Sequence, residues 1–287
     1  MEEIKNMMKI ALTGASGLVG SRIVELLDKD FTFVSIPQNE IDITNKNAVL
    51  EKIKNTDFDI FLHLAGYTNV DGAEKEKELV LKINRDGTKN VFDAVHQKGK
   101  KFIYISTDFV FDGKNPPYYE DSKPNPISSY GLSKYEGEKI LGNDAMIVRI
   151  SYPYRKTFEP KKDFVRIIRS LLEQHKPLAM VTDSLMTPTL IDDIAYALKY
   201  LFVHFSGGVY HINSSDSLSP YDAGKLIAKT YGLDQNLITP TTYKKYFQGK
   251  AFRSQYSDMK SKKNNFYKMR SFEEGLGELK SQISNNK

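Results

Sequence analysis

The sequence of 287 residues contains no cysteine, only five histidines and no long hydrophobic run. The missing thiols exclude a disulfide framework, a thiolate metal site and a cysteine nucleophile. The histidines are scattered without the spacing of metal ligands, so no metal site is predicted. No apolar stretch approaches the ~20 residues that cross a bilayer, and two glutamates stand where a secretory leader would carry positive charge. We therefore expect a cytoplasmic protein without membrane contact.

The charge balance is mildly basic. The chain has 41 lysines and arginines against 36 acidic residues, which gives a formal charge of +5 and a pI near 8.9. The lysines are scattered and often stand beside glutamates, as in KEKE at 75–78. Such interspersed charges indicate a solvated surface, so no nucleic-acid partner is expected, whereas a small anionic ligand such as a nucleotide is compatible with them.

The first half of the chain alternates short apolar runs with amphipathic segments. The runs predicted as strands are 9–13, 31–36, 59–64, 101–106 and 146–150. Between them, segments such as 20–27 and 84–96 repeat apolar residues at three- and four-residue spacing, which indicates helices. This alternation is typical of a doubly wound α/β fold of the Rossmann type, in which crossover helices cover a parallel sheet.

After residue 153 the elements become shorter and mixed. Helices are expected at 164–174, 191–205, 220–231 and 272–283, and strands at 178–181 and 209–212. This part is too small and mixed to form an independent domain. We predict a dinucleotide-binding domain of residues 1–153 and 189–213. A smaller mixed α/β cap of residues 154–188 and 214–287 would cover the open end of the sheet and bind the substrate.

A glycine turn directly follows the first predicted strand. Gly14, Gly17 and Gly20 recur at every third position and lead into a helix. A dinucleotide site needs a tight turn, close approach of the backbone to a pyrophosphate, and a helix N-terminus that offers N–H groups. The GxxGxxG spacing favours short-chain reductases. The second strand ends in the segment 35–38, SIPQ, which is neither acidic nor basic, so the choice between NADH and NADPH stays open.

Reduction of a ketone needs a proton donor beside the hydride of the cofactor, and a tyrosine can supply that proton. A lysine four residues later lies on the same helix face and would lower the pKa of the tyrosine. This YxxxK pattern occurs seven times. Only Tyr130 both opens a predicted helix, with Ser129 as its cap, and follows a strand that ends in a hydroxyl, Thr107. We therefore predict that Tyr130 and Lys134 carry the chemistry and that Thr107 donates a hydrogen bond to the substrate carbonyl. Tyr135 shares the helix but faces elsewhere.

Three further polar residues are interpreted as structural. Asn84 begins a predicted helix, where its side chain would act as the N-cap. His63 and His211 lie inside apolar strands and are predicted to be core histidines.

The motifs together resemble a known family. The turn GASGLVG at 14–20, DITN at 42–45, AGYT at 65–68, ISTDFVF at 105–111 and YGLSK at 130–134 are similar to the extended short-chain dehydrogenase/reductases. Within that superfamily they resemble the dTDP-4-dehydrorhamnose reductase family, over nearly the whole chain. The resemblance implies an oxidoreductase that reduces the 4-keto group of a nucleotide-activated deoxysugar, turning dTDP-4-dehydro-L-rhamnose into dTDP-L-rhamnose. NADPH is the expected cofactor and NADH the alternative.

The resemblance also implies roles for individual residues. The catalytic residues would be Thr107, Tyr130 and Lys134. The residues that would contact the cofactor are Gly14, Gly17, Leu18, Val19, Asp42, Ile43, Leu64, Ala65, Gly66, Tyr130 and Lys134. The residues that would contact the sugar nucleotide are Thr107, Asp108, Tyr152 and Arg253.

Three departures from the family pattern fall in the predicted sugar pocket. Phe109 and Tyr152 stand where a tyrosine and a tryptophan are common, and residues 253–259 depart from the pattern Arg-Pro-x-x-Ser-x-Leu. The sequence therefore determines the type of reaction better than the identity of the sugar. Two alternatives stay open, namely a redox-neutral nucleotide-sugar epimerase or dehydratase, and a non-catalytic regulatory subunit of the methionine adenosyltransferase type. The sequence is compatible with a homodimer.

Overall fold

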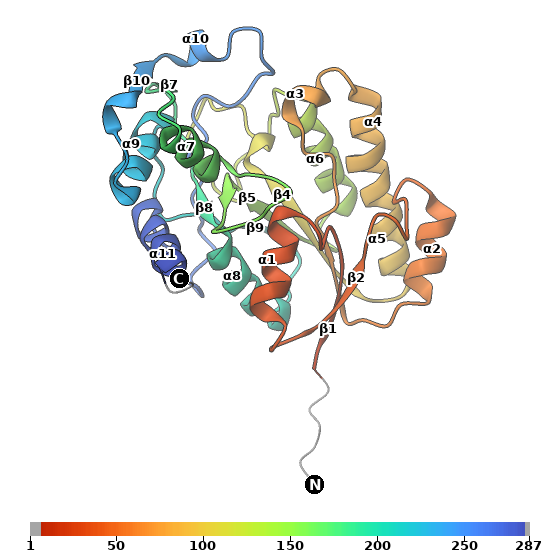
Figure 1. Cartoon of the computed structure of the whole chain (residues 1–287). Helices are drawn as coiled ribbons and strands as arrows, with labels where there is room; N and C mark the ends of the chain where they lie inside the picture. The colour runs from red at the N-terminus through yellow and green to blue at the C-terminus, as the bar shows by residue number, and fades with distance from the viewer. Residues whose placement is uncertain (1–6, 285–287) are drawn as a thin grey trace.

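Six parallel strands form the central sheet of the computed structural model, which describes residues 7–284 (Figure 1). Their spatial order is β2-β1-β3-β4-β5-β9. Their bounds are β1 Lys9–Thr13, β2 Thr32–Ile36, β3 Ile60–His63, β4 Lys101–Thr107, β5 Met146–Ile150 and β9 Gly208–His211. Every pairing in this sheet is parallel. The predicted doubly wound α/β fold is confirmed, and the strand ends lie within one residue of their predicted positions.

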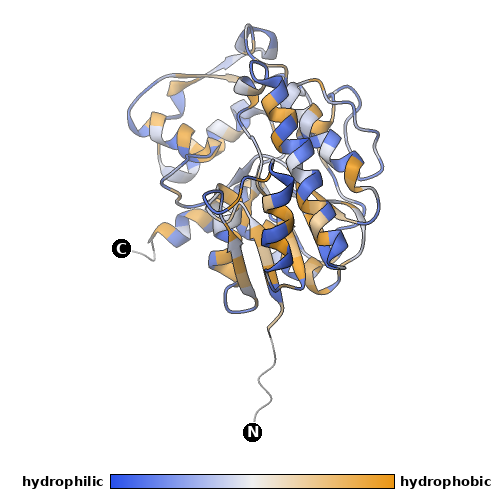
Figure 2. Ribbon diagram, turned by 90° about the vertical axis from the view of Figure 1, so that its right-hand side faces the viewer, coloured by the Kyte–Doolittle hydropathy of each residue, from blue (hydrophilic) through white to orange (hydrophobic). Residues whose placement is uncertain are grey.

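Helices cover both faces of this sheet, because successive side chains of a strand point to opposite sides. On one face Leu12 and Ile103 pack with α1 Leu18–Leu27 and α8 Ile191–Val203. On the other face Phe61 and Phe102 pack with α2 Lys46–Lys54, α5 Thr88–Gln97 and the end of α6 Ser129–Leu141. Figure 2 shows these helices striped with hydrophobic and hydrophilic residues. The strands are therefore buried on both faces, as a parallel sheet requires.

Short helical segments connect the sheet strands near their carboxyl ends. Between β3 and α5 they are α3 Val70–Ala73, α4 Lys77–Leu81 and the π-helix η1 Lys82–Gly87. The 3-10 helix η2 Asp108–Val110 follows β4 directly. This η2 turn matters for function because it joins Thr107, at the end of β4, to the segment that packs against α6.

A smaller lobe sits beside the sheet (Figure 1). Its helices are α7 Phe164–Glu173, α9 Pro220–Tyr231, η3 Gln235–Leu237, α10 Tyr243–Tyr246 and α11 Phe272–Ser284. Its paired strands are β6 Pro153–Tyr154 with β8 Thr189–Leu190, and β7 Leu178–Val181 with β10 Ile238–Thr241. It has its own apolar core, in which Tyr154, Ile227 and Phe272 are buried. The division into two domains at the predicted boundaries stays a prediction.

The ends of α9 illustrate how local sequence places these helices. Ser219 is the N-cap, and its Oγ accepts a hydrogen bond from the backbone N–H of Asp222 at 3.0 Å. Pro220 stands at the first turn, where a missing N–H costs nothing. Gly232 ends the helix with a left-handed backbone, φ +67°. No helix among residues 7–284 is both long and apolar enough to cross a bilayer.

His63 and His211 are fully buried, which confirms that they are core histidines. Nδ1 of His63 lies 2.7 Å from Thr13 Oγ1, and its Nε2 lies 3.2 Å from Thr88 Oγ1. Burial lowers the pKa of His63 to about 3, with a smaller effect from the charge of Lys134. Burial likewise lowers the pKa of His211 to about 4. Both rings are therefore neutral in the folded protein at neutral pH.

Acid should destabilise the fold through these two histidines. Below their ordinary pKa of 6.5 the unfolded chain binds protons that the folded chain does not, so the free energy of unfolding falls from pH 6.5 toward about 4. The loss is on the order of 2 kcal/mol per histidine by about pH 5. Denaturant unfolding at a series of pH values measures it. In His63→Phe the free energy of unfolding should fall less steeply with decreasing pH than in wild type. His96→Gln, on the exposed side of α5, should show the wild-type slope. Equal slopes in wild type and His63→Phe would refute this explanation.

Candidate active site

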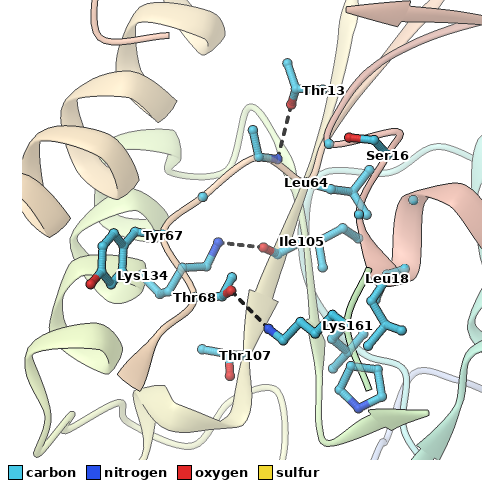
Figure 3. Close-up of a pocket in the computed structure, with 18 of the residues that line it drawn as sticks. Thr13, Ser16, Leu18, Leu64, Tyr67, Thr68, Ile105, Thr107, Lys134 and Lys161 are labelled. Atoms are coloured by element: carbon cyan, nitrogen blue, oxygen red, sulfur yellow. Dashed lines mark hydrogen bonds between the residues drawn. The ribbon is translucent and has the colours of Figure 1, made fainter. Parts of the chain in front are cut away.

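A cavity of about 1030 Å³ lies at the carboxyl edge of the sheet. The strand order reverses there, between β1 and β3, which is where doubly wound sheets form a crevice. Its walls come from the glycine turn after β1, the segment 64–68 after β3, the end of β4, the start of α6 and residues 150–164 (Figure 3). Segments far apart in the sequence thus meet at one site.

The glycine turn brings the backbone of α1 up to this cavity. Gly14 has φ +75°, and a Cβ there would lie 2.9 Å from the carbonyl carbon of Leu64. A Cβ on Gly20 would lie 2.3 Å from Gly14 O. Gly17 is the N-cap of α1 and has no side chain to cover the helix end. The turn therefore leaves the N–H groups of the first helical turn open to an anionic group.

Helix α6 is held against the end of β4 by close packing at its first turn. A Cβ on Gly131 would lie 2.2 Å from Phe109 O, so only glycine allows this approach. Ser128, and not Ser129, caps the helix by accepting a hydrogen bond from the N–H of Gly131 at 3.1 Å. The predicted cap is therefore wrong by one residue. Ser129 instead donates from its N–H and its hydroxyl to Glu74.

Lys134 is buried beneath the cavity floor. Its Nζ donates a hydrogen bond of 2.8 Å to Ile105 O (Figure 3). The same Nζ lies 3.9 Å from the centre of the Tyr104 ring. Burial lowers the pKa of Lys134 to about 7, against the opposing effect of Glu138. The lysine is held in one position by these contacts, and near neutral pH it can exist in either charge state.

Tyr130 lies in the cavity wall, with its ring edge-on to Phe109 at 5.4 Å. Removal from water raises the pKa of Tyr130 to about 12; a hydrogen bond with Thr107 opposes this rise, and the charge of Asp108 adds to it. The expectation that Lys134 lowers this pKa is wrong for this structure, because Lys134 is itself desolvated and is bound to Ile105. The phenol therefore stays protonated at neutral pH.

Asn84 is not a helix cap, as the sequence suggested, but a buried link between two walls of the site. It lies inside η1, where its Oδ1 accepts from the N–H of Tyr67 at 2.7 Å. Its Nδ2 donates to Tyr67 O at 3.0 Å and to Ser133 Oγ at 2.9 Å. Asn84 thus ties the segment after β3 to α6, beside Lys134. A π-helical turn often marks such a functional position.

The structure brings nearly all predicted site residues together. Those that line the cavity are Gly14, Gly17, Leu18, Val19, Asp42, Ile43, Leu64, Ala65, Gly66, Thr107, Asp108, Tyr130, Lys134 and Tyr152. Arg253 does not line it; this guanidinium is bound to both carboxylate oxygens of Asp71, at 3.1 and 2.9 Å. The roles of all these residues stay predictions.

Lys161 is a cavity residue that the sequence reasoning missed. It belongs to the loop between β6 and α7, and Figure 3 shows it reaching toward Thr68, 3.5 Å from Nζ to Oγ1. Lys162 also lines the cavity. No motif marks these two lysines in a chain so rich in lysine; only the path of the loop over the sheet places them at the site.

Tyr130 and Lys134 of α6 face a glycine turn across the carboxyl end of a parallel sheet. This arrangement defines the class of protein. It is that of the extended short-chain dehydrogenases/reductases. The profile of the family described as RmlD substrate binding domain matches residues 8–284. The chain therefore belongs to the RmlD family, the family of dTDP-4-dehydrorhamnose reductases.

Individual relatives agree with this placement. The chain is 31% identical to the probable low-salt glycan biosynthesis reductase Agl14 of Haloferax volcanii, over 79% of this chain and 81% of the relative. It is 30% identical to the dTDP-4-dehydrorhamnose reductase of Sinorhizobium fredii, over 78% of each. It also resembles the crystal structure of a dTDP-4-dehydrorhamnose reductase from Bacillus anthracis in complex with NADP, with a TM-score of 0.89 and 33% identity. That similarity covers 96% of this chain and 99% of the other.

Proposed function

We propose that this enzyme uses NADPH to reduce the 4-keto group of a nucleotide-activated deoxysugar, converting dTDP-4-dehydro-L-rhamnose into dTDP-L-rhamnose. One observation carries the proposal: Thr107, Tyr130, Lys134 and the glycine turn line a single cavity, which is large enough for a dinucleotide beside a sugar. Relatives with the name dTDP-4-dehydrorhamnose reductase support the choice of substrate.

The residues of the cavity fit a nicotinamide dinucleotide. A side chain at Gly14 would collide with Leu64 and Ala65, and one at Gly20 would collide with the turn itself. The turn therefore keeps its backbone open at the N-terminus of α1, where a pyrophosphate can bind. The first acidic side chain after β2 to line the cavity is that of Asp42, whereas Ile36, Pro37 and Gln38, at the end of the strand, line it without a charge. An acid there would repel a ribose 2′-phosphate, so its absence favours NADPH. The bound cofactor supplies the hydride.

Tyr130 is the proton donor in this proposal. When the ketone carbon gains a hydride, its oxygen takes the proton of the Tyr130 hydroxyl, and the C=O group becomes an alcohol. The high pKa of Tyr130 keeps that proton in place at neutral pH until negative charge develops on the ketone oxygen. Lys134, fixed on Ile105 O, places a positive or polar group beneath the same site.

An assay with two reductants tests the proposal. The dTDP-4-keto-6-deoxysugar is made enzymatically and offered with NADPH and, separately, with NADH, while cofactor oxidation is followed. We expect oxidation with NADPH that depends on the sugar. Tightly bound NAD(H) without net turnover would instead support the redox-neutral epimerase or dehydratase. We also propose that the enzyme works in the cytoplasm; a homodimer stays a prediction.

Gly17→Val should weaken NADPH binding at least tenfold while the protein stays folded. A Cβ on Gly17 would lie 3.1 Å from Gly14 O, a close contact that a shift of a few tenths of an ångström relieves, and a branched side chain would cover the N-terminus of α1. Titration of the protein with NADPH by fluorescence or calorimetry gives Kd. Gly277→Val, in the exposed face of α11 with open space around it, is the matched control. Unchanged affinity in Gly17→Val would contradict the assignment of this turn.

A further inference from the structure

Asp108 lies directly behind the predicted catalytic hydroxyls. It is 2% exposed, and both of its carboxylate oxygens accept hydrogen bonds from hydroxyl groups. Thr107 Oγ1 donates to Oδ1 at 3.1 Å, and Ser257 Oγ donates to Oδ2 at 2.5 Å. Thr107 comes from the end of β4, whereas Ser257 belongs to the C-terminal part of the chain. One carboxylate therefore joins the sheet to the cap at the catalytic centre.

The hydroxyl of Thr107 has only one hydrogen, so it can donate only one hydrogen bond. That hydrogen points to Asp108, and the Thr107 oxygen accepts the N–H of Phe109 at 3.3 Å. Thr107 therefore has no second hydrogen to offer to Tyr130 or to a substrate oxygen. Tyr130 is left as the hydroxyl with a hydrogen to give. This differs from the sequence-based expectation that Thr107 itself donates to the substrate carbonyl.

The segment that carries Ser257 is rigidly placed. Its backbone is paired with the segment before β8: Ser257 N donates to Leu185 O, and Leu185 N donates to Gln255 O, both at 2.9 Å. Gly113, with φ +77°, lets the same segment approach the loop after η2, because a Cβ there would lie 2.8 Å from Gln255 N. Ser254 Oγ also donates to Phe111 O. Ser257 is thus presented to Asp108 by a fixed backbone.

We propose that Ser257 and Asp108 are positioning residues for the proton donor. Ser257 holds the Asp108 carboxylate in the orientation that binds the Thr107 hydrogen, and this leaves the Tyr130 hydroxyl as the donor to the ketone. The proposal rests on the proposed ketone reduction and adds a device through which the cap orients the catalytic hydroxyls. A carboxylate fixed at both oxygens holds Thr107 more firmly than an amide or a freely rotating acid would.

The surroundings of Asp108 support an acceptor role. Burial raises the pKa of Asp108, while the hydrogen bonds from Ser257 and Thr107 oppose that rise and favour the charged form. A third hydroxyl, that of the buried Ser151 in the sheet domain, also favours the charged form of Asp108, although its Oγ has no partner within hydrogen-bond distance among residues 7–284. The Ser257 hydroxyl is therefore the contact from the cap that stabilises the carboxylate in this orientation, and its loss should be felt at Tyr130.

Kinetics of a double-mutant cycle test the proposal. Ser257→Ala should lower kcat about tenfold or more, the usual effect of losing a hydrogen bond to a charged group, with KM for both substrates changed little. Ser257→Thr keeps the hydroxyl and should retain most of kcat. In an Asp108→Ala background, Ser257→Ala should add almost no further loss, because its effect passes through Asp108. Ser281→Ala, which removes an exposed serine hydroxyl on α11, is the matched control and should behave as wild type.

A spectroscopic measurement on the ligand-free protein tests the proposal without any turnover. In protein with isotope-labelled tyrosine, the NMR signal of the hydroxyl-bearing ring carbon of Tyr130, assigned with Tyr130→Phe, should shift in Ser257→Ala and Asp108→Ala in the same direction. Ser281→Ala should leave it in place. The proposal would be overturned if the losses of kcat in Ser257→Ala and Asp108→Ala added up in the double variant. It would also be overturned if the Tyr130 signal did not move in folded Ser257→Ala. If the Tyr130 signal shifts as expected in both variants but the wild-type protein reduces no ketone, only the proposed function is refuted.

Discussion

Replacing Tyr130 by phenylalanine should lower kcat for ketone reduction by about 10²- to 10⁴-fold, the usual contribution of a general acid. Phenylalanine keeps the ring that packs edge-on to Phe109, so the fold and the cavity wall should persist. Affinity for NADPH should change only a few fold, because the glycine turn is untouched. Steady-state kinetics, with a separate titration of NADPH, distinguish the two effects.

Tyr135→Phe is the control on the same helix. Its ring packs against the apolar cluster of Val110, Phe111, Tyr118 and Met259, away from the cavity. Tyr135 also precedes a lysine by four residues, so this variant tests the YxxxK pattern at a residue that does not line the cavity. We expect near wild-type kcat. A fully active Tyr130→Phe would move the proton donor elsewhere, and loss in both variants would indicate damage to α6.

Arg149→Met should destabilise the protein by about 3–5 kcal/mol, the cost of leaving a buried charge without its partner. Arg149, 3% exposed on β5, forms two hydrogen bonds with Glu138 of α6, 4% exposed, at 3.0 and 2.6 Å. Ser106 Oγ donates to the same carboxylate at 2.5 Å. The pair fixes the helix that carries the predicted catalytic residues. Denaturant unfolding measures the loss.

The double variant Arg149→Met with Glu138→Leu should recover most of that stability, because neither charge is then buried. Lys89→Met removes the exposed ion pair with Asp93 on α5 and should change stability by less than about 1 kcal/mol. An Arg149→Met protein as stable as wild type, or one that Glu138→Leu does not rescue, would show that the pair does not hold α6 in place.

Much of the fold and the site was predictable because the informative patterns are local. The alternation of short apolar runs with amphipathic helical segments predicted the parallel sheet, whose strand ends all fall within one residue of their predicted positions. The glycine turn was recognisable because its backbone conformation excludes side chains. The YxxxK pattern alone was uninformative; the position of Tyr130 after Thr107 and at the start of a helix selected it. Both residues line the cavity with the turn.

The remaining features depend on contacts between distant segments, which periodicity does not record. Asn84 stands where a helix was expected to begin, yet its partners, Tyr67 and Ser133, lie 17 and 49 residues away. Ser257 reaches Asp108 across 149 residues. The pKa of Tyr130 is raised because the folded chain removes its hydroxyl from water. A lysine four residues later in the sequence therefore did not predict the direction of the shift. Arg253 was expected at the substrate but is bound to Asp71.

The central claim is that a hydride and the Tyr130 proton reduce the 4-keto group. Its most direct test supplies NADPH with deuterium at the transferred position and follows the product of dTDP-4-dehydro-L-rhamnose by NMR and mass spectrometry. The account predicts one deuterium on carbon 4 of the sugar, one NADPH oxidised for each product formed, and almost no product with Tyr130→Phe. Product without deuterium, or a changed sugar with no NADPH oxidised, would contradict it.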